Sequence, residues 1–176
     1  ICIFGKTLGN GYAITSIIGK KEIMECANNS FISSTFWTER IGPTAGLKTI
    51  EVMKKIKSWQ IINDVGNKIR KGWKQLFKLH ELKTSINGVP SLTNFTFQSS
   101  KHQAYKTFIT QEMLKKNFLA TNTIYPCIKH NDRFVEMYLE NLDKILKIIG
   151  YCENNGQDIN KYLDHKVSKR DFYRFN

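Results

Sequence analysis

The N-terminal part of the chain alternates short apolar runs with polar turns. Residues 1–4 and 13–19 are apolar runs of strand length on either side of a glycine-containing turn. Residues 20–27 can form a short helix with its apolar side chains on one face, and residues 31–32 are again apolar. The pattern predicts two strands, a short helix and a further extended piece.

A long helical pattern begins at Gly42-Pro43-Thr44, because proline is favoured in the first turn of a helix. Apolar residues then recur at helical spacing and predict one long helix whose apolar face packs on a core. The members of this stripe are Leu47, Ile50, Met53, Ile56, Ile62, Val65, Ile69, Trp73 and Leu76.

From residue 86 the spacing changes to that of strands. Residues 89–97 alternate apolar and polar side chains after Asn87-Gly88, a pair that favours a turn. Residues 118–125 are predicted to return to strand. The sequence therefore predicts a turn at residues 87–88 and two strands in the C-terminal half.

Two helices alternate with these strands. Ser99 or Ser100 is expected to cap the first helix, and Asn131 is expected to cap the second. Their apolar faces are Tyr105, Phe108, Ile109 and Met113 in the first, and Phe134, Met137, Tyr138, Leu142, Ile145, Leu146 and Ile149 in the second. This order predicts a small α+β domain with helices packed on a sheet.

The C-terminal segments are polar. Residues 153–158 and 161–176 are predicted to lie over the surface. Aromatic residues near the end indicate docking of the C-terminus, and they are Phe172, Tyr173 and Phe175.

Composition favours a globular protein without nucleic-acid specificity. The 176 residues are 41% hydrophobic, enough for one sizeable core or parts of two domains. There are 27 Lys and Arg against 15 Asp and Glu, a formal net charge of +12. The lysines are dispersed and no nucleic-acid-binding motif is present, so specific nucleic-acid binding is not expected. The positive charge can instead attract phosphorylated or carboxylate substrates.

Membrane, metal and disulfide roles have no support in the sequence. No apolar run approaches the ~20 residues that span a bilayer, and no signal peptide is evident, so we expect a soluble cytoplasmic protein without a membrane partner. The scattered cysteines form no zinc motif and are expected to be reduced, mostly buried thiols. They are Cys2, Cys26, Cys127 and Cys152.

The strongest candidate for chemistry is Lys6, in Phe4-Gly5-Lys6-Thr7-Leu8-Gly9-Asn10-Gly11-Tyr12. A lysine at the end of a buried strand would be desolvated, and a neutral amine is what a Schiff base with an aldehyde cofactor requires. Gly9 and Gly11 add backbone freedom where a ring and a phosphate must come close to the main chain. From the residues alone, a solvated loop lysine is the competing interpretation.

A second polar group lies at Ser33-Ser34-Thr35, whose hydroxyls and amides could bind a phosphate or merely cap a turn. Glu39 and Arg40 could clamp a substrate, since arginine binds carboxylates through a planar fork. A surface ion pair or a role at a helix start is the alternative for both. Trp37 could stack on a substrate or serve packing.

The segments that contain Lys6 and Thr35, together with others along the chain, resemble a known family. Residues 4–14 and 17–24 are similar to the cofactor-lysine region of class III aminotransferases, pyridoxal-phosphate enzymes of fold type I, and within them to the glutamate-1-semialdehyde aminomutase-like branch. The similarity continues through residues 31–43 and 105–119 to residues 172–176. Enzymes of this family are more than twice this long, so the resemblance implies a C-terminal fragment.

The resemblance implies an α/β fold. The chain would be the C-terminal part of the fold type I large domain followed by a small α+β C-terminal domain. Residues 1–60 would end the large domain, residues 61–82 would form a connecting helix, and residues 83–176 would form the small domain.

The resemblance also implies roles for individual residues. Lys6 would hold pyridoxal 5′-phosphate and transfer protons. Thr35, with Ser34 beside it, would bind the cofactor phosphate of the neighbouring subunit, which implies a homodimer with shared active sites. The substrates would be small amino and keto compounds, which Trp37, Glu39 and Arg40 could contact through the chemistry given above. The reaction would move an amino group from an amino-acid donor to a keto or aldehyde acceptor, and the fragment alone would be inactive.

The chain departs from the aminomutase pattern beside the active site. The aminomutase has a triple-glycine run after its lysine and a compact Gly-Asn-Pro segment after its threonine, whereas this chain has Gly9-Asn10-Gly11 and the longer segment 36–43. We therefore predict transfer between separate molecules. The alternatives are an aminomutase-type isomerase and a non-catalytic half used for packing and dimerisation.

Overall fold

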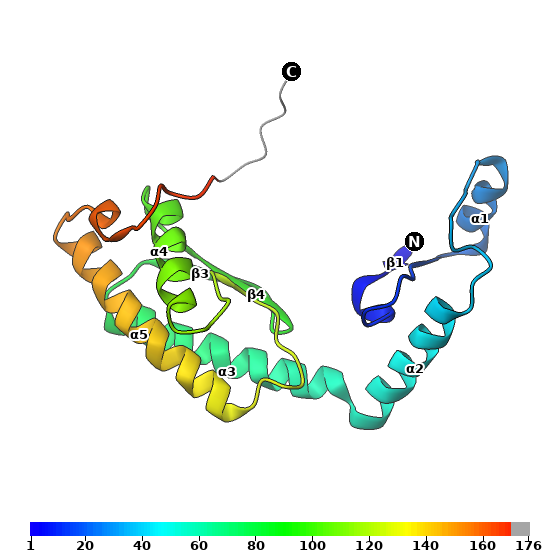
Figure 1. Ribbon diagram of the computed structural model, residues 1–176, viewed down its shortest axis with the longest axis horizontal. Helices are drawn as coiled ribbons and strands as arrows, with labels where there is room; N and C mark the ends of the chain where they lie inside the picture. Colours follow the sequence, from blue (N-terminus) through cyan, green and yellow to red (C-terminus); the bar gives the residue numbers. More distant parts are fainter. Residues whose placement is uncertain (170–176) are drawn as a thin grey trace, which may run out of the picture. The chain divides into compact units, whose positions relative to one another are not determined.

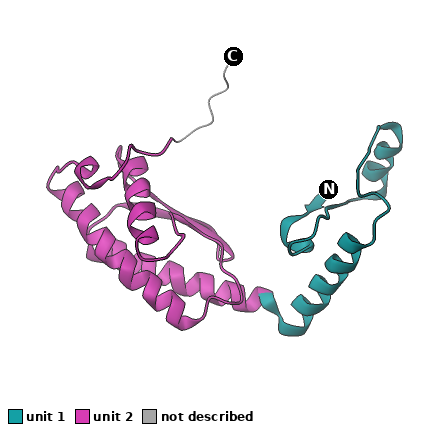
Figure 2. Ribbon diagram, viewed as in Figure 1, with its two compact units in different colours: residues 1–58 teal, residues 59–176 magenta. Residues whose placement is uncertain are grey.

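The computed structural model describes residues 1–169, which fall into two compact units. The first unit is Ile1–Ser58 and the second is Trp59–Asn176 (Figure 2). Each is described separately below, with the element labels of Figure 1.

The first unit is a pair of short antiparallel strands followed by short helical segments and one long helix. Cys2 pairs with Ile18 and Phe4 pairs with Ser16 across the two strands. The elements are β1 Cys2–Phe4, η1 Lys6–Leu8, β2 Ser16–Ile18, α1 Lys21–Met24, η2 Glu25–Asn29 and α2 Ile41–Ile56.

Both strands and the short helix occur where the sequence predicts them, but the strands are shorter. The expectation of a buried first strand is wrong, because β1 is exposed along its whole length. Residues 31–32 form no strand. Cys2, Cys26 and Cys127 are exposed, so the expectation of mostly buried thiols is also wrong, and only Cys152 is buried.

The predicted long helix is interrupted. Lys57 adopts φ 50°, in the left-handed region, and its N–H donates to the carbonyl of Met53 as a helix C-cap. Helix α2 therefore ends at Ile56, and α3 Ser58–Leu79 begins directly after the cap. Because no glycine marks this position, the break cannot be predicted from the local sequence.

The predicted core-facing stripe holds for α3 and not for α2. Val65, Ile69 and Trp73 of α3 are buried. By contrast Leu47 on α2 is 72% exposed, and the apolar residues that follow it on that helix are also exposed. The apolar stripe is thus buried in the second unit and exposed in the first.

The second unit combines helices with a sheet, as the sequence predicts, but its antiparallel sheet has three strands among the described residues where the sequence predicts two. The sheet order is β3-β4-β5. Its elements are α3, β3 Thr84–Val89, β4 Leu92–Phe97, α4 His102–Leu114, β5 Thr123–Ile124, α5 Asp132–Asn154 and η3 Ile159–Tyr162. Helices α3 and α5 lie side by side in the same direction (Figure 1), with Lys68 paired to Asp132 and His80 paired to Asp143.

The hairpin turn lies three residues beyond its predicted place. Val89 pairs with Leu92, so the loop is Pro90-Ser91, and Asn87 and Gly88 belong to the ladder of β3. The predicted strand at residues 118–125 is reduced to Thr123–Ile124.

The two helix caps differ in outcome. Asn131 caps α5 as predicted, since its side chain accepts the N–H of Phe134 at 3.0 Å. The N-cap of α4 is Lys101 rather than a serine, and the Ser99 hydroxyl accepts the Lys101 N–H at 3.2 Å, one residue before the helix.

An aromatic cluster forms the centre of the core. The ring of Phe95 packs edge to face with Trp73 at 4.7 Å and with Phe77 at 4.9 Å between centroids. Phe97 contacts Phe95 at 5.6 Å and Tyr105 at 5.3 Å in the same way. These contacts join α3, β4 and α4, because alternate residues of β4 point inward.

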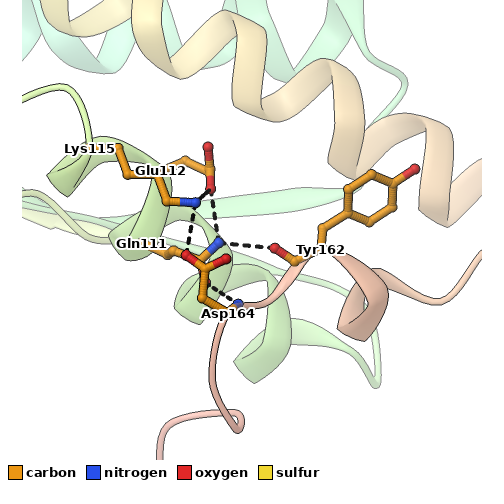
Figure 3. Close-up of polar contacts among 5 residues, drawn as sticks. All are labelled: Gln111, Glu112, Lys115, Tyr162 and Asp164. Atoms are coloured by element: carbon orange, nitrogen blue, oxygen red, sulfur yellow. Dashed lines mark hydrogen bonds and ion pairs between the residues drawn. The ribbon is translucent and has the colours of Figure 1, made fainter.

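The segment after α5 returns along α4 and is held there by polar contacts (Figure 3). Gln111 donates to the Tyr162 carbonyl at 2.9 Å and accepts the Asp164 N–H at 2.7 Å. Lys115 pairs with Asp164 and with Glu112. Desolvation raises the pKa of Glu112, but hydrogen bonds from Lys115 and Gln111 outweigh it, so the pKa is lowered.

This arrangement agrees with the predicted surface path as far as residue 169. The predicted docking residues Phe172, Tyr173 and Phe175 lie outside the described residues. Glu153, in contrast to the predicted surface path, points inward and accepts hydrogen bonds from Tyr105 and Ser99.

Candidate active site

Lys6 lies in residues 5–12, here called the lysine loop. Gly5 is extended, with φ −168°, whereas Lys6 has φ 50°, in the left-handed region that lysine rarely adopts. Asn10 and Gly11 in the same loop have φ 47° and 110°. Such non-glycine backbone costs about 1–3 kcal/mol per residue and concentrates at functional sites. The lysine loop therefore has the strained geometry of a segment that positions a side chain.

The Lys6 side chain is exposed, so the expectation that burial desolvates it is wrong for this chain. The reason is that β1 and β2 pair only with each other and leave the end of β1 uncovered. Within residues 1–169 the Lys6 ammonium has no hydrogen-bond or ion-pair partner. Its amine is thus available to a ligand.

Helix α2 supports the lysine loop through two glycines. A Cβ at Gly42 would lie 2.5 Å from the carbonyl oxygen of Ala13, too close for any side chain. A Cβ at Gly46 would lie 3.6 Å from Ile14 Cδ1 and 3.7 Å from Leu8 Cδ1, which is ordinary contact. Glycine at position 42 lets the helix touch the backbone just beyond the loop.

Ser34 and Thr35 begin the turn before α2. The Ser34 hydroxyl accepts the N–H of Phe36 at 3.3 Å, and the Glu39 N–H donates to the Phe36 carbonyl at 3.3 Å. Thr35 is exposed, and in the described part of the chain its hydroxyl has no partner. Ser34 thus matches the turn-capping alternative, whereas the Thr35 hydroxyl is free to bind an anion.

Glu39 holds the start of α2. Its carboxylate accepts the N–H of Ile41 at 2.8 Å and the N–H of Gly42 at 2.7 Å. A carboxylate at this end of a helix satisfies otherwise unpaired donors and complements the helix dipole. This contact is the helix-start role that the sequence left open for Glu39.

Arg40 and Trp37 remain available for a ligand. Arg40 is the N-cap residue of α2, and its carbonyl accepts both the N–H and the hydroxyl of Thr44. Its guanidinium has no partner within residues 1–169. Trp37 is 68% exposed in the same turn. An aromatic face and a free planar cation therefore lie three residues apart in the chain.

Gly42 connects the two halves of the candidate site. Its N–H binds Glu39 while its Cα faces Ala13, so the lysine loop and the turn before the helix meet at one end of α2. No hydrogen bond joins Lys6 to Thr35 among the described residues. The sequence does not predict this contact between Gly42 and Ala13, because Gly42-Pro43 indicates only the start of a helix.

Two other kinds of site find no support in the structure. Among residues 1–169 no three His, Cys, Asp or Glu side chains gather as metal ligands would. No helix in the same residues is long and apolar enough to cross a bilayer.

Residues 1–149 match the family model described as Aminotransferase class-III. The chain belongs to this family. The match includes the lysine loop, the Thr35 turn and most of the second unit. The residues of the candidate site therefore lie within the part of the chain that the family model matches.

Curated relatives include both transferases and mutases. The chain is 28% identical to the 3-aminobutyryl-CoA aminotransferase of Cloacimonas acidaminovorans over 83% of this chain and 38% of that protein. It is 25% identical to the glutamate-1-semialdehyde 2,1-aminomutase of Saccharolobus islandicus over 85% of this chain and 38% of that protein. The chain thus spans 38% of the length of these relatives.

Solved structures share the fold. The FumI protein of Sphingopyxis sp., in its PLP internal aldimine form, has a TM-score of 0.75 at 17% identity, covering 86% of this chain and 37% of that one. An omega-transaminase from Sphaerobacter thermophilus has a TM-score of 0.70 at 15% identity, covering 82% of this chain and 37% of that one. The chain therefore has the fold of part of a fold type I transaminase.

Proposed function

We propose that this chain supplies the cofactor lysine and the phosphate-binding turn of a pyridoxal-phosphate-dependent aminotransferase. The enzyme would move an amino group from an amino-acid donor to a keto or aldehyde acceptor. The observation that carries the proposal is Lys6: it is unpaired, it has a strained backbone, and its loop is anchored on α2 within the family match.

The residues present fit the cofactor. Lys6 offers an unpaired Nζ to the aldehyde carbon, and Thr35 offers an unpaired hydroxyl to the phosphate. Pyridoxal phosphate, when bound, supplies an electron sink for charge that develops at the substrate Cα. Ser34 contributes less, because its hydroxyl already accepts the N–H of Phe36.

Lys6 also has the proton-transfer role in the proposed reaction. Its Nζ removes the proton from the substrate Cα as a general base and later returns a proton as a general acid. The strained loop defines the backbone position from which this side chain extends, which favours a reaction that depends on orientation.

Arg40 and Trp37 are the proposed substrate contacts. The unpaired Arg40 guanidinium can bind a substrate carboxylate through two parallel hydrogen bonds, and the exposed Trp37 ring, three residues earlier in the chain, offers an apolar surface. Glu39 acts at this site by fixing the start of α2 next to Arg40.

The proposed enzyme is a cytoplasmic homodimer in which Thr35 binds the cofactor phosphate of the neighbouring subunit. The three-part division into residues 1–60, 61–82 and 83–176 stays a prediction. Because the chain spans 38% of its relatives, we expect it to be inactive when isolated and active only with the rest of the fold.

The test of the proposed function separates transfer from isomerisation. Holoenzyme containing this chain is given one amino donor, such as glutamate, in amounts equal to the enzyme and without an acceptor. We expect release of one free keto acid per active site, because a transferase must release its first product before a second substrate enters.

The aminomutase relative defines the opposite outcome. If no donor gives keto acid while glutamate-1-semialdehyde is converted to aminolevulinate, the enzyme is an isomerase. If neither substrate reacts and no cofactor binds, the chain serves only packing and dimerisation.

Thr35→Ala is expected to weaken cofactor binding. A hydrogen bond to a charged phosphate contributes about 1.5–3 kcal/mol, which corresponds to roughly ten- to a hundredfold in affinity. The measurement is the dissociation constant of pyridoxal phosphate for the cofactor-free form of the enzyme that contains this chain, followed by absorbance. Thr38→Ala removes an exposed threonine hydroxyl from the same turn, is the matched control and should leave affinity within about twofold. If the parent and both variants bind pyridoxal phosphate with equal affinity, Thr35 has only a structural role in the turn.

A further inference from the structure

A basic groove lies in the second unit, between the C-terminal half of α3 and β3. It has a volume of about 520 Å³, and among residues 1–169 its lining includes four cationic side chains and no carboxylate. The cations are Arg70, Lys74, Lys78 and Lys83. Such a one-sided charge distribution is unfavourable unless an anion compensates it.

Three of these cations form a row along one face of α3. Arg70, Lys74 and Lys78 are four residues apart, so neighbours are separated by about 6 Å along the helix. Within residues 1–169 Lys74, Lys78 and Lys83 have no ion-pair partner. A single phosphate can reach at most two members of such a row, whereas a ligand with several phosphate groups can reach all of them.

Arg70 is fixed before any ligand binds. Its Nη1 donates to the carbonyl of Gly88 at 2.6 Å and lies 3.5 Å from the Thr93 hydroxyl. Gly88 has φ 81°, which only glycine adopts easily, and Thr93 is fully buried. The remaining guanidinium donors are thus held at the rim of the groove with little further loss of side-chain entropy.

Apolar side chains line the groove together with the cations and with Thr84 and Gln98. Phe77 and Leu82 are buried members of this lining, and the Phe77 ring is held edge to face against Phe95. Ligand sites commonly combine an apolar surface with a few fixed polar groups. The groove can therefore hold a ring or another apolar body next to the phosphate-binding cations.

We propose that this groove binds a small anion with two or more phosphate groups and an aromatic body, the chemistry of a nucleotide. One relative acts, by its name, on a coenzyme A substrate, and coenzyme A is a ligand of this class. The proposal concerns the second unit alone and does not depend on the chemistry of Lys6.

The test uses the 176-residue chain and calorimetric titration at low salt. The probes are adenosine 3′,5′-bisphosphate, coenzyme A, pyrophosphate and inorganic phosphate. We expect saturable one-to-one binding of the two nucleotides and weaker binding of the two inorganic ions. The variant Lys74→Gln/Lys78→Gln should bind the nucleotides about tenfold more weakly.

A matched control separates the groove from net charge. Lys144→Gln/Lys147→Gln removes two exposed, unpaired lysines from α5 and lowers the charge equally. It should change nucleotide affinity by less than about twofold. Equal losses of nucleotide affinity in the two double variants would show that binding depends on net charge and not on the groove.

Three further results would overturn the proposal. The first is no nucleotide binding by the parent chain, and the second is equal affinity for pyrophosphate and the bisphosphate nucleotide, which removes the role of the aromatic body. The third is much tighter, groove-dependent binding of a short single-stranded RNA, which would assign the surface to nucleic acid. Circular dichroism establishes that each variant is folded.

Discussion

Replacement of Lys6 by alanine should abolish transamination by the holoenzyme that contains this chain. Proton transfer by a positioned side chain contributes roughly 10²- to 10⁴-fold to rate, and loss of the covalent link to the cofactor adds to it. We therefore expect a rate at least about 10²-fold below that of the parent, with keto-acid release as the measurement. Borohydride treatment of the parent should fix the cofactor on the peptide that contains Lys6, and this adduct should be absent from the variant.

A second lysine in the same unit provides the control. Lys20 is exposed and precedes α1, so Lys20→Ala makes the same chemical change outside the lysine loop. It should leave both the rate and the borohydride adduct unchanged. A Lys6→Ala enzyme that works at the parent rate, or an adduct that persists on another peptide, would show that Lys6 is not the cofactor lysine.

Local features of the fold could be predicted from the sequence. Asn131 caps α5 because its side chain reaches an N–H only three residues away, and Phe95 and Phe97 point inward because side chains alternate along a strand. The sequence also singles out Lys6 as a candidate, because its neighbours in the chain carry the motif, and its role stays a prediction. Each of these depends on residues close together in sequence.

Features that depend on packing could not be predicted. The break at Lys57 places a lysine in the left-handed region without any glycine signal, and the turn at Pro90-Ser91 lies beyond an Asn-Gly pair that is itself a good turn sequence. The same holds for Gly42, whose contact with Ala13 joins segments far apart in the chain. The propensities of a segment show which conformations it can adopt. Contacts with residues far away in the chain decide which of these conformations forms.

The burial of Lys6 belongs to this second class. A strand that is apolar on both faces is normally covered on both, yet β1 has only β2 beside it in the described chain. The apolar face of α2 is exposed in the same unit. Both observations leave apolar faces of the first unit uncovered among the described residues, in a chain that spans 38% of the length of its relatives.

Truncation of Trp73 should strongly destabilise the second unit. Trp73 is 0% exposed, packs against Phe95, and donates its indole N–H to the Tyr138 hydroxyl at 2.9 Å. Removal of a buried tryptophan side chain costs about 3–5 kcal/mol, against about 5–15 kcal/mol for a whole domain. Trp73→Ala should therefore lower the urea midpoint of the 176-residue chain sharply, measured by circular dichroism. Trp59→Ala, on the same helix but 46% exposed, should cost less than about 1 kcal/mol.

A milder pair of variants separates the hydrogen bond from the packing. Burial raises the pKa of Tyr138, so its hydroxyl stays neutral and can accept the indole N–H. Tyr138→Phe leaves that N–H unpaired in the core, which should cost about 1–3 kcal/mol. Trp73→Phe leaves the Tyr138 hydroxyl unpaired and removes part of the ring volume. The double variant removes both polar groups, so its loss in free energy of unfolding should be smaller than the sum of the single losses. Strict additivity would mean that the two side chains are not coupled and that the core depends on ring packing alone.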